Sequence, residues 1–296
     1  MKTTKLFFTG LFLAGTLFVQ GQSSMSSTLT RFGTETGTGG TGNTFFGYQT
    51  GKQTTGNDNT FIGHRTGVYN QNGSFNTYVG RWAGGDNDND NNTCIGARSG
   101  VENYGSGNTF VGAGAGYDQD GSNNIFIGKY AASGVSISPI NNKLYIENSS
   151  STIPLIWGDF AEDQLKFNGK VGVGYNFGDF PALAGTVDVE NYNLFVYGGI
   201  LTEEVRVMLE GDWADYVFEE NYLLPKLEEV EVFIKENKHL PNVPSAKEVA
   251  ENGIELGKIT TIQQEKIEEL TLYLIQQQKE LNELKEQVKL LLENQK

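Results

Sequence analysis

The chain has 296 residues, 36 of them acidic and 22 basic, and a formal net charge of −14. Its 38 glycines are too many for a helix-rich enzyme, and its 11% aromatic residues are too many for a disordered chain. The acidic balance, without any Lys/Arg cluster, argues against a nucleic-acid partner. Composition therefore favours a glycine-rich β architecture.

Residues 1–21 have the pattern of a secretory signal peptide. Lys2 and Lys5 precede an apolar stretch, residues 6–19, that is too short to span a bilayer. We expect cleavage before Gln22, with an uncleaved anchor helix as the alternative, and a flexible N-terminal segment over residues 22–42. No later apolar run reaches the ~20 residues of a membrane helix. The sequence thus predicts a secreted, extracellular or cell-surface protein with no membrane span after signal removal.

A short unit is repeated six times in the following residues, 43–133. Each copy holds an Asn, a Thr or Ile, two apolar residues and a Gly. The units begin at steps of 16 or 17 residues, at Asn43, Asn59, Asn76, Asn92, Asn108 and Asn124. This period fits one coil of a β-roll or β-solenoid, built from two short strands and two glycine-containing turns. We expect stacked Asn and Thr side chains to hydrogen-bond between coils.

The two apolar residues of each unit are adjacent, so on a strand they point to opposite faces. One slot fills the interior of the coil, and the other forms an apolar row outside. The sequence pattern alone does not decide which of the two apolar slots points outward. Such a row predicts packing against other copies of the chain, with cover by the chain's own flanking segments as the alternative. We assign the second slot to this oligomer interface: Phe46, Ile62, Val79, Ile95, Val111 and Ile127.

These units, over residues 43–132, resemble the head repeats of trimeric autotransporter adhesins. The resemblance rests on the strand-glycine pattern, and the period of 16 is slightly longer than is usual in those heads. It implies that each chain forms a left-handed β-roll and that three rolls pack together.

Two less regular regions follow. Residues 134–200 predict a β-rich neck, with strand-like segments at 143–147, 155–158, 164–167, 170–174 and 194–199. Residues 201–257 predict a small α+β module. There Pro225 suits the first turn of a helix that runs to about Lys238. Ser245 and Glu248 form a capping box that opens a second short helix, and Gly253 closes it.

The last segment, residues 258–296, predicts a coiled coil. Apolar residues alternate at spacings of three and four, interrupted only by Gln277. Glu280 and Lys285 are placed to pair between parallel helices. The heptads do not choose between two and three strands, and an amphipathic helix packed on its own domain is the alternative. The apolar seam positions are Ile267, Leu270, Leu274, Leu281, Leu284, Val288 and Leu291.

The block from Trp213 to Phe218, together with His239-Leu240-Pro241, resembles the tail fibre domain of exported Bacteroidetes-type proteins. That domain is distantly similar to the endosialidase-type intramolecular chaperone of phage tail fibres. The resemblance implies trimerisation by the C-terminal region. In the phage family the region then cuts itself off at a serine, and residues 199–212 contain no Ser. We therefore expect the module to stay attached.

Few residues suggest ligand chemistry. Asp86, Asp88 and Asp90 alternate in a polar loop and are weak calcium candidates, with a solvated turn favoured. The single cysteine, Cys94, fills an aromatic slot and excludes an intrachain disulfide. A second group follows the repeat glycines at corners that are candidates for contact with a glycan or protein ligand: Tyr48, His64, Arg65, Arg81 and Trp82.

The predicted fold class is mainly β: a β-roll or β-solenoid head, a small α+β module and a C-terminal α-helical coiled coil. The predicted function is a homotrimeric fibre with a structural or adhesive role, without cofactor, catalytic residue or enzymatic activity. The alternative is a tail-spike-like fibre that degrades polysaccharide or carries a self-cleaving chaperone domain.

Overall fold

The structure is a computed structural model that describes residues 29–134, 139–174, 178–208, 211 and 213–294. The predicted signal peptide lies outside the described residues. The chain divides into two compact units, Met1–Lys170 and Val171–Lys296, which are described separately. The predicted class, a mainly β chain with a β-solenoid and a long C-terminal helix, is confirmed.

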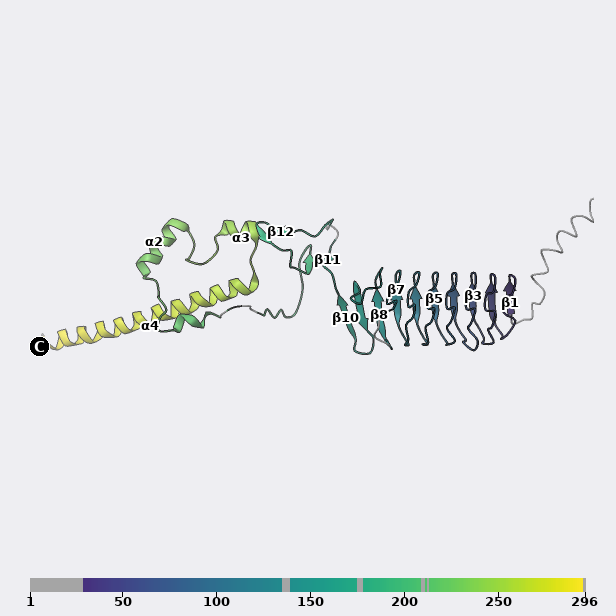
Figure 1. Ribbon diagram of the computed structural model, residues 1–296. Coiled ribbons are helices and arrows are strands. Elements are labelled where there is room, and N and C mark those ends of the chain that lie inside the picture. Colours follow the sequence, from purple (N-terminus) through teal and green to yellow (C-terminus); the bar gives the residue numbers. More distant parts are fainter. Residues whose placement is uncertain (1–28, 135–138, 175–177, 209–210, 212, 295–296) are drawn as a thin grey trace, which may run out of the picture. The chain divides into compact units, whose positions relative to one another are not determined.

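The first unit is a solenoid of about seven turns whose strands form one ten-stranded sheet in chain order. Strands β1 to β8 pair in parallel, while β9 and β10 are added antiparallel (Figure 1). Equivalent residues of successive repeats are partners, as Phe45 is of Phe61. The strands are β1 (Leu29–Phe32), β2 (Asn43–Phe46), β3 (Thr60–Ile62), β4 (Thr77–Val79), β5 (Thr93–Ile95), β6 (Thr109–Val111), β7 (Ile125–Ile127), β8 (Lys143–Ile146), β9 (Ile156–Asp159) and β10 (Gln164–Phe167).

Each described coil from β2 to β7 contains one strand, so the prediction of two strands per coil is wrong. The reason lies in the backbone after each repeat glycine. Gln49, Arg65 and Trp82 adopt left-handed φ values of 53°, 57° and 63°. Repeated left-handed residues turn the chain continuously and interrupt extended structure. The return half of each coil is therefore built from turns.

The prediction of a flexible segment over residues 22–42 is wrong for its described part, residues 29–42. These residues form the first coil, since β1 pairs in parallel with β2. Phe32 stacks on Phe46 with ring centroids 5.0 Å apart. The repeat pattern does not reveal this first coil for two reasons. Leu29 stands where the later coils have Asn, and it precedes Asn43 by 14 residues, whereas the later repeats are 16 or 17 residues apart.

The first apolar slot fills the solenoid interior. Its side chains are at most 6% exposed, and the rings of Phe61 and Tyr78 stack at 4.7 Å. Burial raises the pKa of the Cys94 thiol in this column, in agreement with its expected place as an apolar filler. Because the first slot points inward, the second points outward on every strand. The interior column contains Phe45, Phe61, Tyr78, Cys94, Phe110, Phe126 and Tyr145.

A buried asparagine ladder joins the coils. The backbone N–H of Asn59 donates to Asn43 Oδ1 at 2.8 Å, and that of Asn108 donates to Asn92 Oδ1 at 2.9 Å. Each side-chain amide also donates to a carbonyl of the next coil, as Asn59 does to Gly73 at 2.8 Å. The ladder satisfies backbone groups that the turns would leave unpaired, which explains the Asn in every repeat from β2 to β7.

The described residues of the second unit form two small sheets and four helical segments. Strand β11 (Val171–Val173) pairs with β14 (Leu194–Val196), and β12 (Leu183–Ala184) pairs with β13 (Val187–Asp188). The helices are η1 (Ala214–Phe218), α2 (Leu227–Asn237), α3 (Ala246–Asn252) and α4 (Leu256–Asn294). The residues predicted as a neck thus contribute to both units, because β8–β10 continue the solenoid sheet.

The predicted helix ends agree closely with the structure. The amide of Glu248 donates to Ser245 Oγ at 3.2 Å, which completes the predicted capping box, and Gly253 ends α3 with φ 71°. Pro225 precedes the N-cap residue Lys226 instead of lying in the first turn of α2. Helix α4 begins at Leu256, two residues before the predicted boundary.

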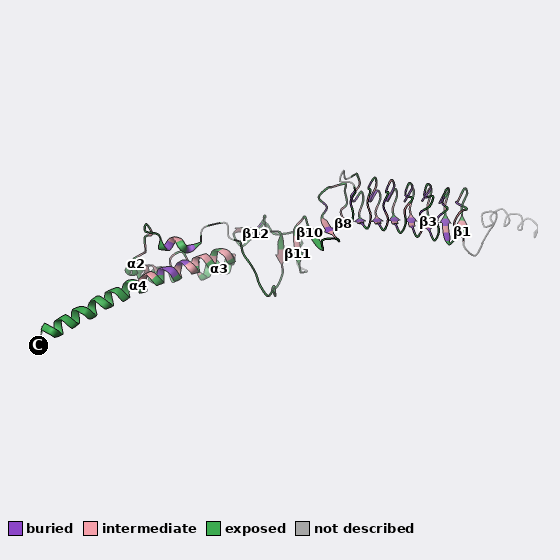
Figure 2. Ribbon diagram, turned by 90° about the horizontal axis from the view of Figure 1, so that it is seen from below, coloured by how far each residue is buried: buried purple, intermediate pink, exposed green. Residues whose placement is uncertain are grey.

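Packing within the second unit is sparse. Among its described residues only three apolar side chains are buried: Val189, Ala214 and Val217. Helix α4 contacts η1, and its C-terminal half is exposed (Figure 2). A unit of this length with so small a core has little hydrophobic stabilisation as a single chain.

Candidate functional site

The second-slot residues form an apolar row along the outside of the solenoid strands. Phe46 is 53% exposed, Ile62 40% and Ile95 41%, with Ile127 at a similar value. Val79 and Val111 are half-buried. The structure therefore places all six predicted interface residues on one outward face of the single chain. Their contact with other copies stays a prediction.

The predicted seam of α4 is uncovered. Leu270 and Leu274 line an open groove of about 750 Å³ together with Gln277 and residues 224–228. The face of α4 that packs against its own unit carries Glu265, Glu268 and Glu269, not the seam. The seam residues are between 45% and 64% exposed: Ile267, Leu270, Leu274, Leu281, Leu284, Val288 and Leu291.

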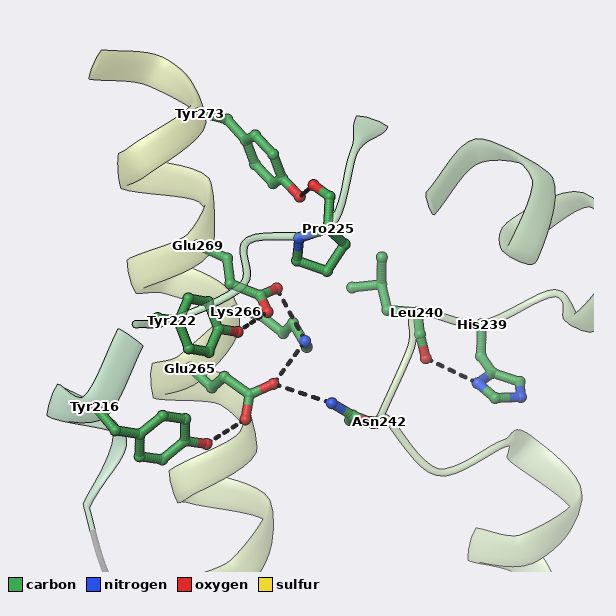
Figure 3. Close-up of polar contacts among 10 residues, drawn as sticks. All are labelled: Tyr216, Tyr222, Pro225, His239, Leu240, Asn242, Glu265, Lys266, Glu269 and Tyr273. Carbon is green, nitrogen blue, oxygen red and sulfur yellow. Dashed lines mark hydrogen bonds and ion pairs between the residues drawn. The ribbon is translucent and has the colours of Figure 1, made fainter. Parts of the chain in front are cut away.

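A tyrosine–carboxylate cluster fastens α4 to η1 and the loop after it (Figure 3). The hydroxyl of Tyr216 donates to Glu265, and that of Tyr222 donates to Glu269 Oε1 at 2.5 Å. Lys266 Nζ lies 2.7 Å from Glu265 Oε1 and 2.9 Å from Glu269 Oε2. Asn242 adds a hydrogen bond to Glu265 at 3.3 Å. We define the cluster as these six residues.

The electrostatics of the cluster follow from its burial and pairing. Burial acts to raise the pKa of Glu265, but hydrogen bonds from Lys266, Tyr216 and Asn242 together lower it below its ordinary value. The hydrogen bond to Glu265, with burial, raises the pKa of Tyr216 to about 12. Burial and Glu269 raise the pKa of Tyr222. Two carboxylates, Glu265 and Glu269, share one ammonium and two phenols, which suits a structural fastening. The neighbouring Glu268 keeps one buried carboxylate oxygen without a hydrogen-bond partner among the described residues.

Sequence reasoning missed this cluster. Tyr216 and Glu265 are separated by 49 residues, so no local pattern joins them. The available signal was the pair Glu265 and Glu269 one helical turn apart with Lys266 between them, an acidic face beside an apolar seam. His239, next to the cluster, has its Nδ1 2.9 Å from the carbonyl oxygen of Leu240.

The aspartates of the acidic loop make structural bonds. Asp88 accepts from the backbone amides of Asn72 and Gly73, and Asp90 Oδ1 accepts from that of Ser74 at 2.7 Å. In the described part of the chain, no group of three or more His, Cys, Asp or Glu residues is arranged to hold a metal ion. Asp86 is exposed beside them.

The predicted corner residues lie together in two neighbouring rows after the repeat glycines. Tyr48, which is 40% exposed, stacks on His64 with centroids 5.4 Å apart. The guanidinium of Arg65 lies 5.3 Å from the ring centroid of Trp82. Arg81 is exposed on the same corner as Trp82, its chain neighbour.

Comparison with protein-family models finds no match for this chain, and searches of curated proteins and of solved structures find none. Among the helices in the described ranges, none combines the length and apolar character needed to cross a membrane. The assignment of function therefore rests on the surfaces described above.

Proposed function

We propose that the chain is one subunit of a parallel homotrimeric fibre, secreted or at the cell surface, with a structural or adhesive role. The uncovered seam of α4 carries this proposal. Seven large apolar side chains at heptad spacing stay 45% to 64% exposed in the single chain. An amphipathic helix of this pattern reaches stability in water by packing its seam against sister helices.

The sparse core of the second unit also supports the proposal. Among its described residues three apolar side chains are buried, and the others are half-buried or exposed. The groove lined by Leu270, Leu274 and Gln277 is open where a second helix would fill it. Association of copies removes this apolar surface from water and so completes the core of the unit.

Parallel association also suits the solenoid. Its outward row, from Phe46 to Ile127, repeats once per coil, so copies in the same direction and register align apolar residues with each other along the whole row. The number of three rests on the resemblance of the repeats to autotransporter heads and of the C-terminal region to tail fibre domains. Three copies of one surface also bind ligands multivalently.

Disulfide trapping of a Gln277→Cys variant tests parallel register. Gln277 is a seam position, so identical residues of two copies face each other, whereas Lys279→Cys, two residues away, lies off both the seam and the groove and is the control. The native Cys94 is 0% exposed and does not compete. Mild oxidation is expected to crosslink the first variant into a covalent pair of chains and to leave the second uncrosslinked. Equal crosslinking of both, or none of the first, contradicts the proposal.

A further inference from the structure

The solenoid separates its charges around the coil. The first two positions after the repeat glycines from Gly47 to Gly128 contain cations and no acidic residue. We call Arg65, Arg81, Arg98 and Lys129 the basic row. The acidic residues of the same coils lie in the loops that lead to the next strand, at Asp58, Asp86, Asp88, Asp90, Glu102, Asp118 and Asp120. This corner is thus locally basic from the coil of Gly63 onward, whereas the equivalent position of the first coil is the acidic Glu35.

The cations of the basic row have no acidic partner within the described parts of the chain. Among the described residues, none of the four forms an ion pair, although Lys52 at the start of the solenoid pairs with Glu35 at 2.7 Å. Arg81, Arg98 and Lys129 are exposed, and Arg65 is half-buried. Their charge is therefore available to a ligand.

The row is held in place before any ligand arrives. Arg65 and Arg98 have left-handed φ values of 57° and 59°, and the backbone amide of Arg98 donates to the carbonyl of Arg81 at 2.9 Å. Arg65 Nε donates to Gln49 Oε1 at 2.7 Å, and its guanidinium lies over Trp82. Ordering the backbone and one guanidinium in advance reduces the entropy lost on binding.

We propose that the basic row binds an acidic polysaccharide that carries carboxylates along a linear chain. Parallel strands are ~4.8 Å apart, so Arg65, Arg81 and Arg98 offer one cation on each of three successive coils, and Lys129 follows two coils later. The cations alternate between the second and the first position after the repeat glycine, so they occupy two neighbouring rows. A guanidinium recognises a carboxylate through two parallel hydrogen bonds. The exposed imidazole of His64 borders the row with ring nitrogens that pair with sugar hydroxyls. The side chains of Tyr48 and Gln49 are engaged with Glu35 at the start of the solenoid.

Two other linear polyanions fit less well. A single-stranded nucleic acid stacks its bases on free aromatic faces, whereas Tyr48 and His64 stack on each other and Arg65 covers Trp82. An extended acidic peptide presents same-face side chains about 6.6 Å apart, out of step with cations carried on coils ~4.8 Å apart.

The inference rests on the proposed adhesive role, for which it names the ligand class. Its test is the affinity of the full chain for polygalacturonate, measured by biolayer interferometry at low salt, with neutral dextran, oligothymidylate and polyglutamate as comparison probes. The row variant is Arg81→Gln with Arg98→Gln. The control, Lys235→Gln with Lys247→Gln, makes the same change of net charge at exposed sites of the second unit. Light-scattering mass of each variant separates loss of binding from loss of assembly.

Wild type and control are expected to bind polygalacturonate, and not dextran, with affinity that falls as salt is raised. Each lost charge-assisted contact is worth about tenfold, so the row variant should bind about 100-fold more weakly with unchanged mass. Unchanged affinity of the row variant, equal weakening of the control, or tighter binding of oligothymidylate or polyglutamate would overturn the proposal. A wild-type mass that differs from that of three chains, with polygalacturonate binding retained, would instead count against the proposed trimer.

Discussion

Replacement of Leu274 by Asp should weaken the assembly at the centre of the α4 seam. Leu274 is 64% exposed in the single chain. Complete burial of a leucine is worth about 1.5–3 kcal/mol, so covering the exposed share contributes about 1–2 kcal/mol per chain and about 3–6 kcal/mol per trimer. The lost burial corresponds to about a 10²- to 10⁴-fold rise in the dissociation constant, and an unpaired carboxylate in the seam adds to it.

Sedimentation equilibrium over a range of protein concentrations measures this change. Ile275→Asp is the matched control, because Ile275 is the next residue of α4, is 47% exposed and lies off the seam. The Leu274→Asp variant is expected to dissociate at concentrations where wild type and Ile275→Asp stay associated. Identical association curves for all three proteins, or equal weakening by both substitutions, would refute the reasoning.

Three further predictions concern the solenoid and the tyrosine–carboxylate cluster. Ile95→Asp should disrupt association of the chains. Phe110→Ala opens a cavity at a 0% exposed site and should cost about 3–5 kcal/mol of folding stability. A melting scan with light scattering separates the loss of association from the loss of stability. Asn92→Ala leaves the buried amide of Asn108 and the carbonyl of Gly105 unpaired and should cost about 2–6 kcal/mol by denaturant titration; a change under about 0.5 kcal/mol would count against the ladder. The raised pKa of Tyr216 means that its bond to Glu265 stabilises the fold below about pH 10 and that this stability is lost as pH rises to about 12. Wild type should therefore exceed Tyr216→Phe in stability at neutral pH, with the difference vanishing near pH 12; a pH-independent difference would contradict this.

The repeat and the seam were predictable because their signals are periodic and local. The Asn of each unit bonds the next Asn along the chain, so the same residue is needed at every coil. The outward row follows from two adjacent apolar residues on a strand, only one of which fits inside. The heptad spacing of α4 likewise identifies its seam without any knowledge of the fold.

Other features were not readable from local patterns. Leu29 packs against the core of the first coil without the marker Asn, so the repeat search did not find that coil. The number of strands per coil depends on the backbone of Gln49 and its equivalents, and left-handed φ is uncommon for such residues. The contacts of Tyr216 and Tyr222 depend on how η1 meets α4, which is decided by tertiary packing.

The mass of the full chain in dilute solution, measured by multi-angle light scattering, tests the central claim most directly. The uncovered seam and outward row predict an assembly of several chains, and the proposed trimer predicts a particle with three times the 32.5 kDa of one chain, stable on dilution. A well-folded particle with the mass of one chain would show that these apolar surfaces need no sister copies, and would contradict the account.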